Sequence, residues 1–369
     1  MSFGLTIPFT GLRKQYNNLR TEILDATDEV LRSGILMNGN WTSEFEHWLA
    51  KRNNVRHAVT CHSGTHALEI LAAFYKHLLA EDSPTIVIPT FTYAATANAF
   101  IRAGWNVHFV DTDRYGILDP NHIPNIDYQA IILVGLYGAS LTQLEHTHHW
   151  MDWGLTDKYI LEDGAQHWLA SNSRRIAPTA ISFDPMKNLP CYGNGGAIVG
   201  GTADLIEFAR EWRNNGKPTH HATGTNSRMS ELDCAHMMVK TRYIDQWQSR
   251  RRAIVTYWLE RLSNNPHVKS LVDSKNLSTH ALHKFVIHTD NRDQLRKMLD
   301  VRKIETKIHY ERPLHETGMF SQYPGPNMLS TASSLARRVL SLPIYPELTD
   351  LEVEYIIDQL LDCAAQMHN

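Results

Sequence analysis

The chain has 369 residues, of which 43% are hydrophobic, and a formal net charge of −3 at pH 7. This length and composition allow a large buried core and suggest about two domains. The charge balance gives no basic surplus for nucleic-acid binding. No apolar run approaches the ~20 residues that a membrane-spanning helix requires, so a membrane protein is not indicated either.

The N-terminal stretch MSFGLTIPFTGLRKQYNN lacks the apolar core of a signal peptide, because charged and polar residues arrive by Arg13. The four cysteines are far apart and have no paired spacing, so neither a disulfide framework nor a zinc site is expected, and a reducing cytoplasm fits. The run His146–His149 could bind a metal. A solvated helix is favoured instead, because no further cluster of ligands accompanies it.

The first predicted element is a helix over 12–33, where apolar residues recur at helical spacing and Gly34 can end the helix. A second short helix holds Phe45, Trp48 and Leu49. Short, nearly continuous apolar strands then alternate with helices, which predicts a buried, mostly parallel sheet in a doubly wound α/β domain. Strands are expected at 57–61, 85–89, 106–111, 129–134, 158–163, 180–183 and 196–200, and helices at 64–79, 94–103 and 144–154.

The C-terminal part follows a different pattern. Residues 229–262 are expected to be largely helical and to lead out of the first domain. We therefore predict a large α/β domain over 1–245 and a small α+β domain over 246–369. In the small domain, strands are expected at 283–289 and 305–310, and helices at 291–301, 331–340 and 349–364, with a Pro/Gly-rich loop at 322–327.

Ligands of doubly wound sheets bind beyond the carboxyl ends of the strands, so the residues that follow each strand are the candidates for a site. Ser63, Gly64 and Thr65 follow the first strand at a helix start, where free N–H groups favour a phosphate. An ordinary helix cap explains them equally well. Phe91 and Tyr93 follow the second strand, where an aromatic ring could stack on a flat cofactor or simply pack in the core.

The later strand ends carry a carboxylate and a lysine. Asp163 ends the apolar strand KYILED and could pair with a protonated ring nitrogen, and Gln166 could bond a ring substituent. Lys187 lies between Pro185 and Pro190, outside any regular helix, where a lysine can form a Schiff base with an aldehyde. Pyridoxal 5′-phosphate (PLP) needs a lysine, a carboxylate, a phosphate cradle and a stacking group. The chain offers one of these after each of four strands.

These motifs resemble those of the DegT–StrS sugar aminotransferases, which are PLP enzymes of the aspartate-aminotransferase fold (fold type I). The resemblance extends over essentially the whole chain. It rests on IPFTGLRKQY, SGTHALEIL, PTFTYAATANA, FVDTD, LYG, EDGAQ, SFDPMKNLPCYGNGGAI, NSRMSEL, KIHYERPLH and LPIYPELT.

The resemblance implies a role for each matching residue. Lys187 is implied to hold PLP covalently and Asp163 to bind the pyridinium nitrogen. Asn226 is implied to reach the phosphate in the neighbouring subunit, so a homodimer with shared active sites is expected. Gln166 is implied to contact the ring, Tyr93 to stack on it, Gly64, Thr65 and Ser182 to hold the phosphate, and Arg228, His309 and Tyr310 to lie near the sugar. Alternatively, Arg228 could only tie the dimer together, and His309 and Tyr310 could only pack a strand end.

The implied reaction is a ping-pong transamination from L-glutamate to a keto nucleotide-sugar. The motifs are most similar to those of the branch that aminates 3-keto, dTDP- or UDP-linked hexoses or uronic acids, and Arg228 could pair with a substrate carboxylate. Asn194, Trp168 and the EDSPT turn depart from the common pattern. Three alternatives are a dehydratase of the same family, in which histidine replaces the lysine, a non-catalytic regulator, and an aminotransferase acting on a non-sugar carbonyl.

Overall fold

The computed structural model describes residues 6–141, 157–170, 177–220, 222–325 and 329–367. The helix expected over 144–154 and the His146–His149 run lie outside these ranges. Within the described ranges, no group of three or more His, Cys, Asp or Glu side chains is placed to hold a metal ion. No helix in the same ranges is both long enough and apolar enough to cross a membrane. All four cysteines are free and buried.

The centre of the fold is a seven-stranded sheet in the order β1-β7-β6-β5-β4-β2-β3. Strands β2 to β6 run parallel, whereas β7 is antiparallel to both β1 and β6. The expected α/β class and mostly parallel sheet are therefore confirmed. The strands are β1 Ala58–Cys61, β2 Thr85–Pro89, β3 Asn106–Val110, β4 Ala130–Val134, β5 Tyr159–Asp163, β6 Thr179–Ser182 and β7 Gly196–Val199.

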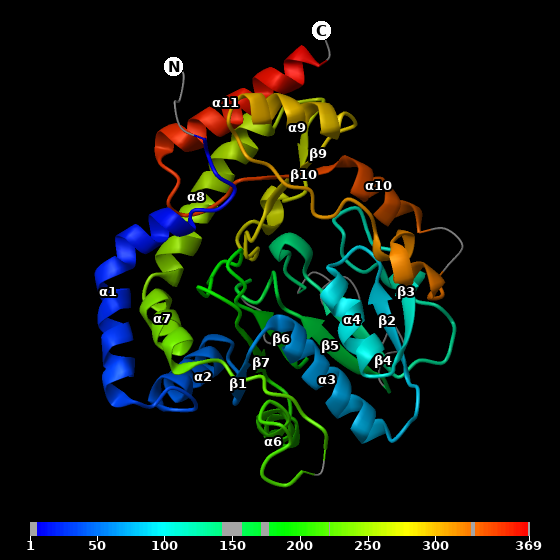
Figure 1. The fold of residues 1–369 in the computed structure, drawn as a ribbon. Coiled ribbons are helices and arrows are strands. Elements are labelled where there is room, and N and C mark those ends of the chain that lie inside the picture. The colour runs from blue at the N-terminus through cyan, green and yellow to red at the C-terminus, as the bar shows by residue number, and fades with distance from the viewer. Residues whose placement is uncertain (1–5, 142–156, 171–176, 221, 326–328, 368–369) are drawn as a thin grey trace.

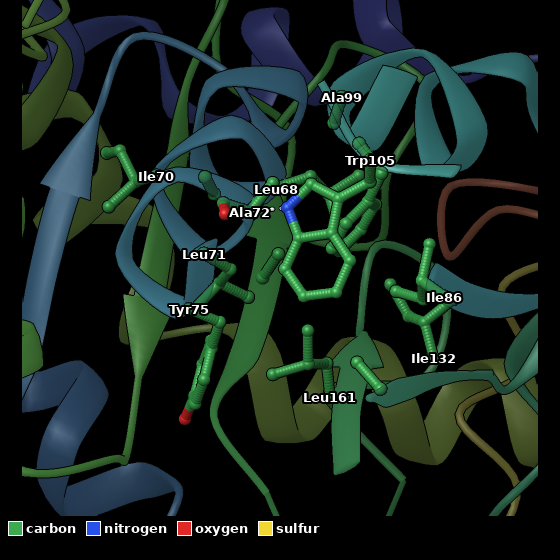
Figure 2. Packing of buried hydrophobic residues seen from close by; sticks show 14 of the residues in the cluster. Leu68, Ile70, Leu71, Ala72, Tyr75, Ile86, Ala99, Trp105, Ile132 and Leu161 are labelled. Carbon is green, nitrogen blue, oxygen red and sulfur yellow. Dashed lines mark hydrogen bonds between the residues drawn. The ribbon is translucent and has the colours of Figure 1, made fainter. Parts of the chain in front are cut away.

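One face of this sheet packs against helices α3 (Gly64–Leu79), α4 (Ala94–Arg102) and α6 (Ala203–Trp212). Figure 2 shows the part of this packing that involves α3, α4 and the sheet, where the Trp105 indole N–H donates a 2.9 Å hydrogen bond to the Ala72 carbonyl. The bond satisfies a polar group that would otherwise be buried without a partner. The sequence reasoning missed α6.

The opposite face is covered by helices α1 (Leu12–Ser33), α2 (Asn40–Arg52), α7 (Glu231–Thr241) and α10 (Ser330–Arg338). In β4, Ala130 and Ile132 face the first set of helices, and Ile131 and Leu133 face this second set. Both faces of the strand are therefore buried, which explains its continuous apolar sequence. Figure 1 shows α1 and α7 running side by side along one flank of the molecule.

The C-terminal part has a three-stranded antiparallel sheet in the order β10-β9-β8, packed with α8, α9 and α11. Helix α8 begins at the expected domain boundary near residue 245, and the division there stays a prediction. The elements are α8 Ile244–Leu262, β8 Lys269–Ser270, β9 Phe285–His288, α9 Arg292–Val301, β10 Val339–Leu342 and α11 Asp350–Gln366.

Two expectations for the C-terminal part are wrong. Residues 305–310 do not form a strand, since Lys307 makes a single bridge to Ser341 before the chain turns away. The helix expected to reach residue 340 ends at Arg338, and Val339 starts β10, which completes the small sheet beside β9. In both places the outcome depends on pairing between segments far apart in the chain.

Candidate active site

Nine of the eleven expected site residues line one cavity of about 340 Å³. The cavity lies beyond the carboxyl ends of β1, β2, β5 and β6, where parallel α/β sheets bind ligands. Residues of the 305–310 segment, residues just before β9 and residues just before β7 also line the cavity. The nine residues are Gly64, Thr65, Tyr93, Asp163, Gln166, Ser182, Lys187, His309 and Tyr310.

Lys187 lies in a series of turns after β6, and its N–H donates a 2.9 Å bond to the Asp184 carbonyl. Burial lowers the pKa of the Lys187 amine, and the carboxylates of Asp163 and Asp184 oppose that shift. A lysine whose amine is made less basic by burial is available as a nucleophile at lower pH.

Asp163 is the last residue of β5 and is 5% exposed. The Thr96 hydroxyl donates a 2.7 Å bond to its Oδ2, and the Ala165 N–H donates a 3.1 Å bond to its Oδ1. Both carboxylate oxygens are therefore held in place, and the group faces the cavity. Thr96 has no role in the sequence reasoning, because its position on α4 relates it to Asp163 only through the fold.

Gln166 and the two tyrosines form a connected wall. The Gln166 Oε1 accepts a 2.7 Å bond from the Tyr137 N–H, so its Nε2 is the end that donates to the Tyr310 hydroxyl at 3.1 Å. Tyr93 is 60% exposed, and its ring centre lies 6.1 Å from that of Tyr310. The Gln166 amide is therefore oriented by the Tyr137 backbone on one side and by the half-buried Tyr310 phenol on the other.

The start of α3 forms the opposite wall. Ser63 caps the helix, since its Oγ accepts a 3.2 Å bond from the His66 N–H. The N–H groups of Gly64 and Thr65 have no partner in the described part of the chain. Free N–H groups at a helix start are a site for a phosphate. Ser182 lies directly against Gly64 and brings a hydroxyl to the same place.

His309 and Tyr310 close the cavity from the C-terminal part. The His309 Nδ1 lies 2.8 Å from the Ser341 hydroxyl, and the Tyr137 hydroxyl donates to the His309 carbonyl. Burial, together with nearby Lys284, Lys307 and Lys187, lowers the pKa of His309 to about 3. Burial also raises the pKa of Tyr310 above its ordinary value. Both side chains are therefore neutral near pH 7.

Asn226 and Arg228 lie elsewhere. Neither lines the cavity, Asn226 is exposed, and the Arg228 Nη2 donates a 3.1 Å bond to the Asn226 Oδ1. Their expected contacts, with a phosphate across a dimer interface and with a sugar, stay predictions. Arg228 was also expected to pair with a substrate carboxylate; its guanidinium bonds Asn226 here, and that pairing stays a prediction.

Lys284 lines the same cavity and was missed by sequence reasoning. It directly precedes β9 and is 5% exposed. The sequence signal that could have identified Lys284 is a lysine inside the apolar run HKFVIHT, because lysine is rarely buried in a hydrophobic strand without a specific role.

The lining residues fit PLP. The amides of Gly64 and Thr65 offer unbonded donors for a phosphate, and Ser182 adds a hydroxyl. A side chain at residue 64 would fill that cradle, since its Cβ would lie 2.6 Å from the Ser182 Cβ. Asp163 has the carboxylate that a ring nitrogen would need and Lys187 the amine that an aldehyde would need.

Comparison with known proteins agrees with this geometry. Residues 17–361 match the DegT/DnrJ/EryC1/StrS aminotransferase family. The dTDP-3-amino-3,4,6-trideoxy-alpha-D-glucose transaminase of Streptomyces venezuelae is 33% identical, with 98% of this chain and 97% of that protein covered. The pleiotropic regulatory protein of Geobacillus stearothermophilus is 30% identical, with 97% and 98% covered.

A crystal structure of S. venezuelae DesV in complex with a ketimine intermediate has the same fold. Its TM-score is 0.87 at 32% identity, and the match covers 98% of this chain and 99% of DesV. The family match and the relatives extend over nearly the full chain. The chain therefore belongs to the DegT/DnrJ/EryC1/StrS aminotransferase family.

Proposed function

We propose that this member of the family is a PLP-dependent aminotransferase that moves an amino group from L-glutamate to a 3-keto, dTDP- or UDP-linked sugar. The observation that carries the proposal is the meeting of Lys187, Asp163 and the α3 start in one cavity. The name of the S. venezuelae relative supports a 3-amino nucleotide-sugar as product.

PLP would supply an aldehyde that accepts an amine and a ring that withdraws electrons when its nitrogen carries a proton. Lys187 would hold it covalently. Asp163, fixed by Thr96 and Ala165, would bond the ring nitrogen. Gly64, Thr65 and Ser182 would hold the phosphate, with Gln166 and Tyr93 on the ring.

Lys187 also carries the proton that the reaction must move. Its burial disfavours the ammonium form, so the free amine can take a proton from the donor carbon and deliver it to the former aldehyde carbon of the cofactor, on the far side of the shared nitrogen. The Asp163 carboxylate faces the same cavity as Lys187, where it would stabilise a positive charge on the ring nitrogen. His309 and Tyr310 stay neutral, and they shape the cavity without competing for that proton.

A homodimer is part of the proposal. Asn226 is exposed and lies outside its own cavity, which suits a residue that serves a neighbouring subunit. We expect Asn226→Ala to weaken PLP binding without unfolding the chain. A fully active monomer would contradict shared sites.

The name of the G. stearothermophilus relative, a pleiotropic regulatory protein, suggests a regulatory role as an alternative to catalysis. A regulator without catalysis has no need of a half-buried lysine in the same cavity as a hydrogen-bonded carboxylate. The dehydratase alternative requires histidine in place of Lys187, and this chain has lysine there.

The test is a panel of 3-keto and 4-keto dTDP- and UDP-sugars, each incubated with glutamate and read by mass spectrometry. We expect a 3-keto sugar to gain an amine, and the Lys187→Ala protein to form none. Borohydride reduction should fix the cofactor to the peptide that contains Lys187. Amination of none of the panel would remove the sugar assignment, and a reducible adduct in Lys187→Ala would remove the role of Lys187.

A further inference from the structure

Lys284 places a second amine in the active-site cavity, and no carboxylate is bonded to it. The residue is 5% exposed and lines the cavity together with Lys187. Within the described part of the chain its Nζ has no hydrogen bond and no ion pair. Its Nζ lies over the ring of Phe9, 4.9 Å from the ring centre.

Lys307 adds a second positive charge beside it. The Lys307 Nζ lies 5.2 Å from the centre of the same Phe9 ring and is exposed. An aromatic face attracts an ammonium group, so Phe9 holds both lysines near the cavity.

The surroundings of Lys284 are mainly cationic. Burial lowers its pKa well below the ordinary lysine value, and the neighbouring cations add to that shift. Asp184 is the carboxylate that opposes it. The charged and titratable groups that face Lys284 are Lys187 and Asp184 after β6, Arg251 on α8, His283 beside it, and Lys307 and His309 in the 305–310 segment.

An amine that is largely withdrawn from water and bonded to no carboxylate costs free energy of folding, and an apolar side chain at this position would avoid that cost. The backbone does not require lysine at this position. The backbone N–H of Lys284 donates a 3.0 Å bond to the Tyr137 carbonyl, and any residue other than proline could make that bond. A lysine that is kept in the cavity at this cost, with no carboxylate bonded to its amine, is available to bind an anionic ligand.

We propose that Lys284 binds a carboxylate of the substrate, with Lys307 supplying a second positive charge beside it. This inference rests on the proposed function, because it names a group of the molecule that reaches Lys187. It moves the carboxylate contact from Arg228 to Lys284. A carboxylate is a terminal group that can reach a buried ammonium, whereas the diphosphate of a nucleotide-sugar is flanked on both sides.

Two substrates could bring that carboxylate. One is the amino donor, a dicarboxylate amino acid in the proposed reaction. The other is a uronic acid, whose carboxylate lies on the sugar. The contact at Lys284 has the same chemistry in both cases, and binding probes that do not react can separate the two sources.

The test compares the wild-type protein, as purified with its cofactor, with Lys284→Met. Lys297→Met on α9 is the control, because Lys297 is exposed and outside the cavity. The probes are glutarate, a dicarboxylate with neither amine nor ketone, and the pair UDP-glucuronate and UDP-glucose, which differ in one carboxylate. Dissociation constants are measured by calorimetry.

We expect Lys284→Met to weaken either glutarate or UDP-glucuronate by about 10- to 100-fold, as loss of a hydrogen bond to a charged group does. UDP-glucose should change little. Weaker binding of glutarate would identify the amino donor as the source of the carboxylate at Lys284. Weaker binding of UDP-glucuronate alone would identify a uronic acid as that source. Equal losses for both UDP-sugars without a loss for glutarate would indicate a diphosphate contact and overturn the proposal. Affinities within about twofold of the control for all probes would also overturn it.

Two further readouts separate binding from a structural role. Carboxylate binding should favour the ammonium form of Lys284, so calorimetry in buffers of different ionisation enthalpy should show proton uptake in the wild type and less in Lys284→Met. The thermal midpoint of Lys284→Met should equal or exceed that of the wild type, because the variant buries no unpaired amine. A lower midpoint together with loss of all binding would show a structural residue.

The binding assay is independent of transamination. If glutarate binding depends on Lys284 but no keto sugar is aminated, the proposed function fails and the carboxylate site stands. If sugars are aminated while Lys284→Met binds every probe normally, the carboxylate site fails alone.

Discussion

Gly64 and Ser182 are in such close contact that a Cβ atom at residue 64 would lie 2.6 Å from the Ser182 Cβ. The contact joins the start of α3 to the end of β6, two segments separated by more than a hundred residues. It keeps the free amides of the helix start and the Ser182 hydroxyl on one wall of the cavity.

We therefore expect Gly64→Ala to weaken PLP binding by about tenfold or more, because the two backbones must separate to admit the methyl group. Gly193→Ala is the matched control, since a Cβ there meets no atom within 4 Å. PLP affinity is measured from its absorbance during titration of cofactor-free protein. Equal PLP affinity in the two variants would show that the close contact does not support the phosphate cradle.

Thr96 is a positioning residue for Asp163, to which it donates a 2.7 Å bond. We expect Thr96→Val to lower kcat while leaving the folded state intact, and Thr96→Ser to restore it because the hydroxyl is kept. Asp163→Asn should lower kcat by about 100-fold or more, in line with the loss of a group that controls a proton. Steady-state kinetics at saturating glutamate checks both. Failure of serine to rescue would show that the methyl group of Thr96, not its hydroxyl, matters.

Glu46 and Arg213 form a buried ion pair behind the site, and each is about 5% to 6% exposed. The Arg213 Nη1 lies 2.7 Å from the Glu46 Oε1 and 3.0 Å from the Thr60 hydroxyl on β1. Arg213→Met would leave a buried carboxylate without that partner, so we expect a loss of about 3–5 kcal/mol in the free energy of unfolding.

Arg210→Met is the control for this prediction. Arg210 bonds the other Glu46 oxygen at 2.9 Å, but its side chain is 49% exposed. A pair with one exposed partner contributes about 1 kcal/mol or less. Urea unfolding of both variants measures the difference, and equal losses would contradict the role assigned to burial.

We expect His280 to make the fold sensitive to acid. Burial, with Arg252 nearby, lowers the pKa of His280 to about 3 from 6.5. Below pH 6.5 the unfolded chain binds a proton that the folded chain does not, so stability falls as pH falls from 6.5 toward 3. The loss from this residue is at most about 1.4 kcal/mol per pH unit.

We expect His280→Asn to reduce the steepness of that loss, because asparagine can still accept the 2.9 Å bond from the Leu282 N–H and does not titrate. The unfolding midpoint in urea is compared at pH 7, 6 and 5, with the exposed His122→Asn as control. The same dependence on pH in both variants would rule out His280 as a source of acid sensitivity.

The sequence by itself predicted the seven strands of the central sheet to within one residue at each end. Strand and helix periodicity is local, and in β4 both faces are buried, so its apolar run is continuous. The rule that ligands bind at the carboxyl ends of strands then predicted, from the sequence, that Lys187, Asp163 and Gly64 share one site. His309 and Tyr310 were placed near the site by their resemblance to family motifs.

Only the tertiary structure decided the features that depend on contacts between distant segments. Lys307 pairs with Ser341 at a single bridge, so 305–310 is no strand, and Val339 leaves the helix to join β9. Thr96 meets Asp163 because the fold brings the first turn of α4 to the carboxyl end of β5. Lys284 became a candidate for the same reason: a lysine in an apolar run is unusual, but only the fold places it, buried, in the cavity of Lys187.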